Sequence, residues 1–413
     1  MSLKVKNMFF KNLKFFLMIN IFLISLPIFA EENSEATNRF TLTNGYWETQ
    51  YNSNEGIVYF PMSVIDTYDW GFRKLSLDSN IFGRSFSFIL SRILGEYINT
   101  TYLNTPFHEF GHATRFQSYG YNIIRYNVGE DNSVTANSYF EMVFKRAKTG
   151  PVGASTSGNY SLLNTSQDLI VTAGGVNNEI LLSERLSDRI YERGGSVPDL
   201  FFYIDNKNGP EEYFSISSAS GDPAIILKRY KTLGLNISKE DIMSSYNFSL
   251  FASGTFYSLL WGNIKYFYNG EQDIKPIEIF GFSLPDFYTF LNSRGLSIKT
   301  ILNYRVNDAL NFGLSYEKVY NGISYDEFVS QFRLALKLNS SYFKYLIIKP
   351  QLLIGAGDTV DWGGSLLTEL EGTYFGTFAK YTYYNSNTLY GERNIPFINK
   401  PNELLAGFFV NLR

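Results

Sequence analysis

The chain has 413 residues, which is room for two ordinary domains or one large β-rich domain. Aromatic residues make up 17% of it and charged residues only 18%, a balance that excludes intrinsic disorder. The 36 basic and 39 acidic residues give a net charge of −3, so no nucleic acid is expected as a partner. Cysteine is absent, which excludes disulfides, thiolate metal sites and cysteine nucleophiles.

The first 30 residues have the pattern of a secretory signal peptide. Four lysines precede an apolar run from Phe15 to Phe29, and Ala30 is a small residue suited to cleavage. A membrane anchor is the alternative, but the run has about fifteen residues and a bilayer needs roughly twenty. We therefore expect an exported protein from which residues 1–30 are removed. No later apolar run is long enough for a spanning helix, so membrane residence of the mature protein would use strands.

The rest of the chain divides into three parts by its hydrophobic pattern. Residues 31–62 are predicted to form N-terminal strands, at Phe40 to Tyr51 and at Gly56 to Phe60. Residues 63–293 are predicted to be mainly helical and to contain the chemistry. This prediction rests on the helical spacing of apolar residues. The segment Gly129 to Gly158 is expected to be long and irregular. The helical stretches are Ser87 to Tyr97, Leu169 to Tyr191 and Ile242 to Phe267.

Residues 294–413 are predicted to form an antiparallel meander. Apolar residues alternate with small or polar ones such as Asn311, Gly313 and Ser315, and turn residues separate the runs. Runs of about ten residues with charge on one face and aromatics on the other favour an outer-membrane β-barrel over a soluble β domain. The fold class predicted for the chain is therefore α+β, a helical insert combined with this meander. The alternating runs are 309–316, 328–338, 360–373 and 404–413.

One short motif carries chemistry. His108 and His112, the only histidines of the chain, lie four residues apart and follow Pro106, a natural first residue of a helix. Two imidazoles one helical turn apart can bind a single Zn²⁺, and Glu109 beside the first can take a proton from an activated water. Gly111 leaves room for a neighbouring element. With both histidines in this motif, none remains for a Ser-His-Asp triad.

A catalytic zinc needs a third protein ligand, which must here be a carboxylate. The best candidate is Glu179, which follows small residues at 173–175 that would let two helices approach each other. The pair Asn178-Glu179, together with His108-Glu109-x-x-His112, resembles the gluzincin metallopeptidases, the thermolysin-like group. The resemblance covers about thirty residues of 413 and does not imply that family's overall fold.

The resemblance leaves the surroundings of the metal open. In that family an aspartate four residues after the glutamate orients one histidine, whereas Ser183 stands at that position here. In an alternative register Glu184 would be the ligand and Asp188 the orienting carboxylate. The family often stabilises the oxyanion with a histidine or tyrosine; Arg115, Tyr119 and Tyr121 are close in sequence, and none of them is assigned this role.

These observations predict an exported zinc metallopeptidase associated with the outer membrane. It would act on a peptide or protein substrate and contact outer-membrane lipid. Glu109 would be the catalytic base, and His108, His112 and Glu179 the zinc ligands. Two alternatives remain: a non-enzymatic surface or outer-membrane protein with a structural metal, and a soluble periplasmic peptidase with a β-sandwich.

Overall fold

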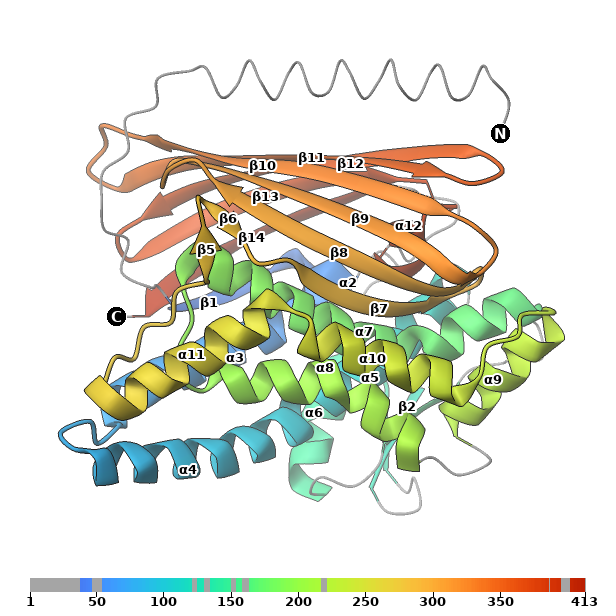
Figure 1. Cartoon of the computed structure of the whole chain (residues 1–413), viewed down its shortest axis with the longest axis horizontal. Helices are drawn as coiled ribbons and strands as arrows, with labels where there is room; N and C mark the ends of the chain where they lie inside the picture. The colour runs from blue at the N-terminus through green and yellow to red at the C-terminus, as the bar shows by residue number, and fades with distance from the viewer. Residues whose placement is uncertain are drawn as a thin grey trace.

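The computed structural model describes residues 38–46, 54–120, 125–129, 134–149, 154–157, 163–216, 221–385, 387–394 and 402–412. The expected signal peptide, residues 1–30, lies outside these ranges. A large antiparallel sheet forms one layer, and most of the helices gather on one side of it (Figure 1). The α+β class predicted from the sequence is confirmed.

The large sheet has eleven strands in the order β1-β14-β13-β12-β11-β10-β9-β8-β6-β5, with β7 also paired to β8. From β8 to β14 the strands follow one another as a meander, as predicted. The strands are β1 (Asn38–Thr43), β5 (Glu278–Ile279), β6 (Phe282–Ser283), β7 (Asp286–Asn292), β8 (Gly295–Arg305), β9 (Leu310–Gly322), β10 (Asp326–Lys337), β11 (Phe343–Ala356), β12 (Val360–Gly372), β13 (Phe375–Tyr384) and β14 (Asn402–Leu412).

The prediction of a closed barrel is wrong, because the sheet is open. Within the described residues β1 pairs with β14 alone, and β7 with β8 alone. The alternating pattern fixes which face of each strand is polar, but it does not specify what the outermost strands pair with. Gly56 to Phe60 was also expected as a strand, but these residues belong to helical segments.

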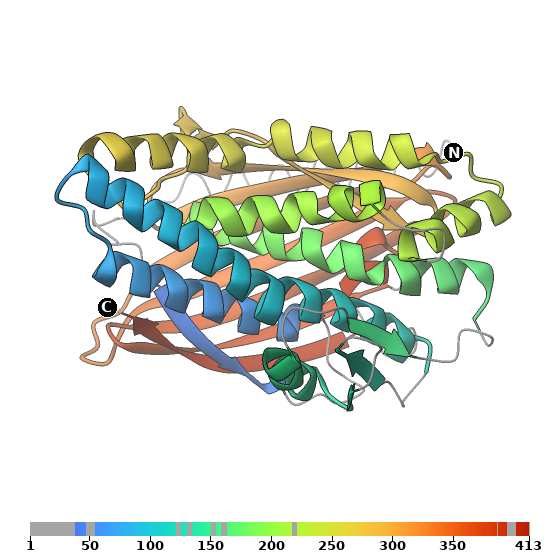
Figure 2. The same cartoon turned by 90° about the horizontal axis from the view of Figure 1, so that it is seen from below.

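The helices run across one face of the sheet (Figure 2). The stretches Ser87 to Tyr97 and Leu169 to Tyr191 are helical as predicted, and Ile242 to Phe267 forms two helices that meet at Ala252 and Ser253. The helices are α2 (Asn54–Ile57), α3 (Tyr59–Leu75), α4 (Ile81–Ile98), α5 (Thr105–Ser118), α6 (Tyr139–Thr149), α7 (Thr165–Arg193), α8 (Asp199–Ile216), α9 (Asp222–Thr232), α10 (Lys239–Phe251), α11 (Gly254–Asn269) and α12 (Leu389–Asn394).

The expected irregular excursion at Gly129 to Gly158 is partly regular. It contributes α6 and two strands, β3 (Val134–Ala136) and β4 (Ala154–Ser157), which pair on either side of β2 (Arg125–Val128). The polar composition of this segment gives no strand signal in the sequence, because its short strands form only by pairing with β2. Among the helices of the described residues, none combines the length and the apolar character that crossing a bilayer requires.

The sheet has a polar inner face and an apolar outer face. On the inner face, Lys299 Nζ lies 2.7 Å from Glu184 of α7. Lys349 Nζ lies 2.5 Å from Glu192, further along the same helix. The outward side chains of the same strands are exposed and apolar. This is the reverse of a soluble sheet, whose apolar face lies against the helices. Outward residues include Leu314, Phe328, Trp362, Leu366, Leu404 and Phe408.

One open edge of the sheet is covered by a helix. The backbone N–H groups of Arg39 and Thr41 in β1 point away from β14, and α3 supplies their acceptors. Asp66 Oδ2 accepts from Arg39 at 2.9 Å and Ser63 Oγ accepts from Thr41 at 2.9 Å. An unpaired edge exposes such groups to other chains, so α3 does here what a neighbouring strand would do in a closed barrel.

At the opposite edge of the sheet, backbone groups of β7 are also bonded by side chains outside the sheet. The side-chain amide of Asn177 in α7 accepts from Leu291 N–H at 3.0 Å and donates to Leu291 C=O at 2.7 Å. Ser253 Oγ accepts from Phe287 N–H at 2.9 Å. Side chains of α7 and of the residue before α11 therefore replace a strand beside β7.

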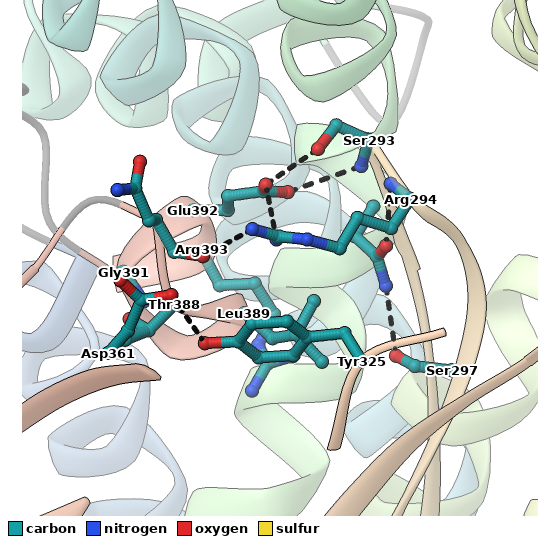
Figure 3. A network of polar contacts seen from close by, with 12 residues as sticks. Ser293, Arg294, Ser297, Tyr325, Asp361, Thr388, Leu389, Gly391, Glu392 and Arg393 are labelled. Carbon is teal, nitrogen blue, oxygen red and sulfur yellow. Dashed lines mark hydrogen bonds and ion pairs between the residues drawn. The ribbon is translucent and has the colours of Figure 1, made fainter. Parts of the chain in front are cut away.

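Helix α12 sits within a network of polar contacts (Figure 3). Glu392 accepts from Ser293 Oγ at 2.6 Å and from Arg294 Nη1 at 3.1 Å. Arg393 Nη1 donates to Glu317 of β9 at 2.6 Å. These contacts attach the connection between β13 and β14 to the turn between β7 and β8.

Helix α7 also holds α3 through a buried cluster of charges. Arg189 forms ion pairs with Asp66 and Asp199, and its Nη1 lies 2.9 Å from Asp69 Oδ2. All four side chains are buried. Burial, followed by the charge of Asp199, raises the pKa of Asp69, although Arg189 opposes this. Each carboxylate is tolerated in the interior because the guanidinium is present.

We predict that Arg189→Met lowers the free energy of unfolding by about 3–5 kcal/mol, since it leaves the buried Asp69 and Asp199 without their cation and Asp66 with only the 3.4 Å contact to Arg193. Lys265→Met is the control: Lys265 Nζ lies 3.8 Å from Glu271, both side chains are more than 40% exposed, and the loss should be below about 1 kcal/mol. Urea unfolding followed by tryptophan fluorescence measures both. Equal losses would contradict the structural role given to the buried cluster.

Candidate metal centre

The histidine motif lies at the start of a helix, as expected. Helix α5 begins at Thr105 with Pro106 in its first turn. The chain enters α5 from a π-helical segment, Asn99–Asn104, that continues α4. Such segments are frequent at functional sites, because they re-aim side chains that an α-helix would point elsewhere.

Both histidine rings lie on one side of α5. Their centroids are 4.9 Å apart, and both residues are buried together with Glu109. One donor atom of each of His108, Glu109 and His112 lies within 4.8 Å of the others. This buried group could hold a metal ion.

Glycines let α5 and α7 approach each other at this point. A Cβ at Gly111 would lie 2.2 Å from the carbonyl oxygen of Gly174, and one at Gly174 would lie 2.5 Å from that of Gly111. A Cβ at Gly175 would lie 2.3 Å from His108 Nε2. The close approach predicted from Gly111 and the small residues at 173–175 is therefore confirmed, and the His108 ring occupies the space that a side chain at Gly175 would need.

Asn178 holds this contact in place. Its Nδ2 donates to the carbonyl of Phe107 at 2.9 Å, and its Oδ1 accepts from Arg115 Nη1 at 2.8 Å. Arg115 is thus part of the contact between the helices and does not line the cavity described below. Tyr121 lies outside the described residues.

The Nδ1 atoms of both rings are engaged by α7. Glu179 Oε1 lies 2.6 Å from His108 Nδ1, and the carbonyl oxygen of Val171 lies 2.8 Å from His112 Nδ1. Glu179 Oε2 accepts from Asn104 Nδ2 at 3.1 Å. A carbonyl can only accept, so His112 carries its proton on Nδ1, and the Nε2 lone pair of a neutral ring is left for a metal.

The two Nε2 atoms converge on a residue that the sequence did not suggest. Asp222 Oδ2 lies 3.6 Å from His108 Nε2 and 3.3 Å from His112 Nε2. Asp222 begins α9, and Pro223 follows it in the first turn. Its sequence signal is only that of a helix start, so nothing in the local pattern connects it with histidines 110 residues earlier.

These three atoms need a cation between them. Neutral imidazole Nε2 atoms and a carboxylate oxygen are all acceptors, so they repel one another unless a proton or a metal ion intervenes. Burial lowers the pKa of both histidines, but the contacts with Asp222, and for His108 also with Glu179, outweigh it and raise the pKa. The same contacts lower the pKa of Asp222 against the effect of its burial.

The spacing also fits a metal. Ligands bonded to Zn²⁺ at about 2.0–2.1 Å in a tetrahedron lie roughly 3.3–3.5 Å from one another. The distances from Asp222 Oδ2 to the two Nε2 atoms, 3.3 and 3.6 Å, match this separation. These two separations are compatible with ligands of one metal ion.

Glu184, the alternative third ligand, does not lie beside the histidines. Glu184 lies against Lys299 of the sheet, and its pKa is lowered because that lysine and Arg185 outweigh the effect of burial. Asp188 pairs with Arg185 at 3.1 Å; burial raises its pKa to about 6. Both side chains face the sheet, so the structure does not bring them to the histidines.

A cavity of about 430 Å³ adjoins His108 and Glu109. Tyr213 of α8 lines it: its ring meets that of His108 edge to face at 5.7 Å, and its hydroxyl donates to Asp222 Oδ2 at 3.3 Å. Burial and the charge of Asp222 raise the pKa of Tyr213, so the hydroxyl keeps its proton at neutral pH. Tyr213 was not expected at the site, because no local motif distinguishes it among the 31 tyrosines of the chain.

Comparisons with models of protein families, with curated proteins and with solved structures found no match for this chain.

We predict that Gly175→Ala weakens zinc binding at least about tenfold, because the new methyl group displaces the His108 ring. Gly71→Ala is the matched control: Gly71 lies inside α3, and a Cβ there meets no atom within 4 Å. Competition with a chromophoric chelator measures the affinity, and thermal melting of the metal-free proteins checks the fold. Equal zinc affinities in the two variants would argue against a metal at this ring.

Proposed function

We propose that this chain is an exported zinc-dependent peptidase associated with the outer membrane. The observation that carries the proposal is the convergence of His108 Nε2, His112 Nε2 and Asp222 Oδ2 beside a cavity lined by Glu109. This set of donors is typical of a hydrolytic zinc site, and the His-Glu-x-x-His spacing supports the same reading.

The structure favours Asp222 over Glu179 as the third ligand. Glu179 contacts the Nδ1 side of His108, away from the point where the two Nε2 atoms meet Asp222. A carboxylate at that position orients the ring and makes it a better ligand. We therefore propose His108, His112 and Asp222 as the ligands, with Glu179 positioning His108 and the Val171 carbonyl positioning His112.

Zinc, when bound, would polarise the scissile carbonyl and make a water more acidic. Glu109 would accept the proton of the attacking water and then give it to the leaving amine. Tyr213, whose hydroxyl donates to Asp222 Oδ2, would hold this carboxylate in position for the metal. The cavity of about 430 Å³ gives a substrate segment room beside these groups.

The outward face of the sheet supports the membrane association. Its apolar side chains are exposed while its charges pair inward with α7, an arrangement that suits lipid on the outside and polar groups within. Helix α4 also exposes large apolar residues, among them Phe82 and Ile93. Side chains of α3 and α7 also bond backbone groups at both edges of the sheet, which lowers the cost of placing those groups in an apolar environment.

A structural metal in a protein without enzymatic activity is the competing proposal. The burial of His108 and His112 is compatible with it, because structural sites are closed, but the side chain of Asp222 is 23% exposed. The cavity beside Glu109 favours the enzyme, since a purely structural site needs no space for a substrate.

We predict that Glu109→Gln lowers kcat for peptide hydrolysis at least about a thousandfold and leaves one zinc per chain, because the amide cannot accept the proton. Glu271→Gln, at an exposed carboxylate, should change neither quantity. Release of new amino groups from casein, followed in detergent, measures hydrolysis; atomic absorption measures zinc. Retained activity in Glu109→Gln would remove this residue from its role, and zinc without hydrolysis of any peptide would favour the structural site.

A further inference from the structure

Helix α4 packs against the protein through small residues and exposes its large apolar ones. Its buried residues are Ser87, Ser91 and Gly95, which share one face because they are four residues apart. The hydroxyl of Tyr68 donates to the Ser91 carbonyl at 2.8 Å, and Ser87 Oγ accepts from Leu77 N–H at 2.8 Å. A surface helix of a soluble protein turns its apolar stripe to the core, so the polarity of α4 is reversed. The exposed apolar residues of α4 include Phe82, Phe86, Ile89, Ile93 and Leu94.

Helix α11 also turns large apolar side chains outward. Gly254, Ser258 and Gly262 lie four residues apart on its buried side, next to Leu259 and Tyr266. Contacts through small residues, with large apolar residues on the outside, are typical of helices that pack together in a membrane. The exposed apolar and aromatic residues of α11 are Tyr257, Leu260, Trp261, Ile264 and Tyr268.

The charged residues of the two helices do not lie free on these outward faces. They are Arg84, Arg92 and Glu96 in α4 and Lys265 in α11. Arg84 donates to a backbone carbonyl of α11 at 3.3 Å, and Arg92 forms an ion pair with α8 at 2.7 Å. Glu96 and Lys265 lie near the C-terminal ends of their helices, in ion pairs of 3.6 and 3.8 Å. Charges that are paired, or placed near a helix end, lower the cost of contact with an apolar environment.

The outward face of α4 joins the outer face of the sheet at one edge. A groove of about 560 Å³ between α3 and α4 is lined mostly by apolar groups, among them Leu90 and Leu94 of α4 and Phe40 of β1. Phe40 also points outward from the sheet, because its neighbour Arg39 points inward to Glu369. The apolar surface therefore continues from the sheet across α3 to α4.

At the opposite edge the apolar surface of the sheet continues to α11. The short strands β5 and β6 expose Ile279 and Phe282. Ser258 Oγ of α11 accepts at 2.9 Å from the N–H of Ile277, the residue before β5, and so joins the helix to these strands.

Exposed apolar side chains thus lie on opposite sides of the molecule. The sheet and α4 are separated by α7 and α8 (Figure 1), and α4 lies in front of the strands when the molecule is seen from below (Figure 2). A second copy of the chain, or another protein, would cover one of these sides and leave the other in water. Lipid acyl chains contact all sides at once, and an apolar surface of this extent is rare on proteins that stay in water.

We propose that the outward faces of α4 and α11 contact lipid acyl chains, as the outer face of the sheet does, so that lipid surrounds the molecule. Each helix needs to be apolar on one side only, because its other side packs on the protein. The inference rests on the proposed membrane association of the sheet and gives the helical side the same partner.

Tryptophan fluorescence of the full chain, reconstituted in phosphatidylcholine vesicles, tests the inference. Trp261 lies on the outward side of α11 and Trp362 on the outer face of the sheet, and they are 53% and 59% exposed. One variant keeps only Trp261 and another only Trp362; the remaining tryptophans, with Trp47 and Trp70 in both variants, are replaced by phenylalanine. Phosphatidylcholine brominated at the middle of its acyl chains quenches tryptophans that contact the chains, whereas acrylamide quenches from the water.

Two further variants lack all four natural tryptophans. Ile93→Trp places the probe on the outward face of α4, and Lys231→Trp, at an exposed lysine of α9, is the control for a position in water. Brominated lipid should lower the emission of Trp261 and of Ile93→Trp at least about twofold, as it does that of Trp362, and should leave Lys231→Trp unchanged. Acrylamide should quench Lys231→Trp most strongly.

A chain with a single tryptophan could melt at a lower temperature than the natural chain. In that case Trp261→Phe in the natural chain replaces the first variant, and it should remove part of the emission that brominated lipid quenches. An unchanged quenched emission would count against the inference in the same way as an unquenched Trp261.

The failures of the two claims are distinguishable. Quenching of Trp362 by brominated lipid without quenching at both helix positions overturns the inference and leaves the membrane association of the sheet standing. Helix positions shielded from brominated lipid and from acrylamide alike overturn it in favour of a protein partner, a second copy included. No quenching of Trp362 by brominated lipid defeats the membrane association and the inference together.

Discussion

The close contact between α5 and α7 is the constraint on which the candidate site depends. Gly111 and Gly174 bring the two backbones together, and Gly175 leaves the space that the His108 ring fills. At the same contact Asn177, Asn178 and Glu179 point from α7 in three directions, to the sheet edge, to α5 and to His108. A single buried helix therefore fixes the edge of the sheet, the position of the histidine helix and the orientation of one imidazole.

The same helix explains why the sheet can be polar inside. Lysines of the inner face find their carboxylates on α7, and Arg189 of α7 gathers the aspartates of α3 and α8. Buried charges are tolerated only when paired, so the sheet and the helices depend on each other for their charges. The exposed apolar side chains of the strands lie on the outer face of the sheet, whereas other apolar strand residues, among them Leu353 and Phe409, are buried.

Much of this arrangement was predictable from local patterns, and the part that was not depends on contacts distant in sequence. Alternation in 309–316 and 360–373 identified strands and their polar faces, but not the helices that replace neighbouring strands at β1 and β7. The histidine spacing identified the helix and predicted that both rings lie on one side of it. Glu179 was correctly placed near His108, yet its contact is with Nδ1, because the direction of a ring is set by packing against Gly175. Asp222 carries no local signal at all, since it approaches the histidines only when α9 packs against α7.

The central claim is that His108, His112 and Asp222 bind one metal ion, and X-ray absorption at the zinc edge of the metal-loaded chain tests it most directly. The account predicts one tightly held zinc per chain with two imidazole nitrogens at about 2.0–2.1 Å and the remaining positions filled by oxygen; Asp222→Ala should remove one of these oxygens or release the metal. A chain that retains no zinc after dialysis, a zinc without imidazole scattering, or a spectrum that Asp222→Ala leaves unchanged would contradict it.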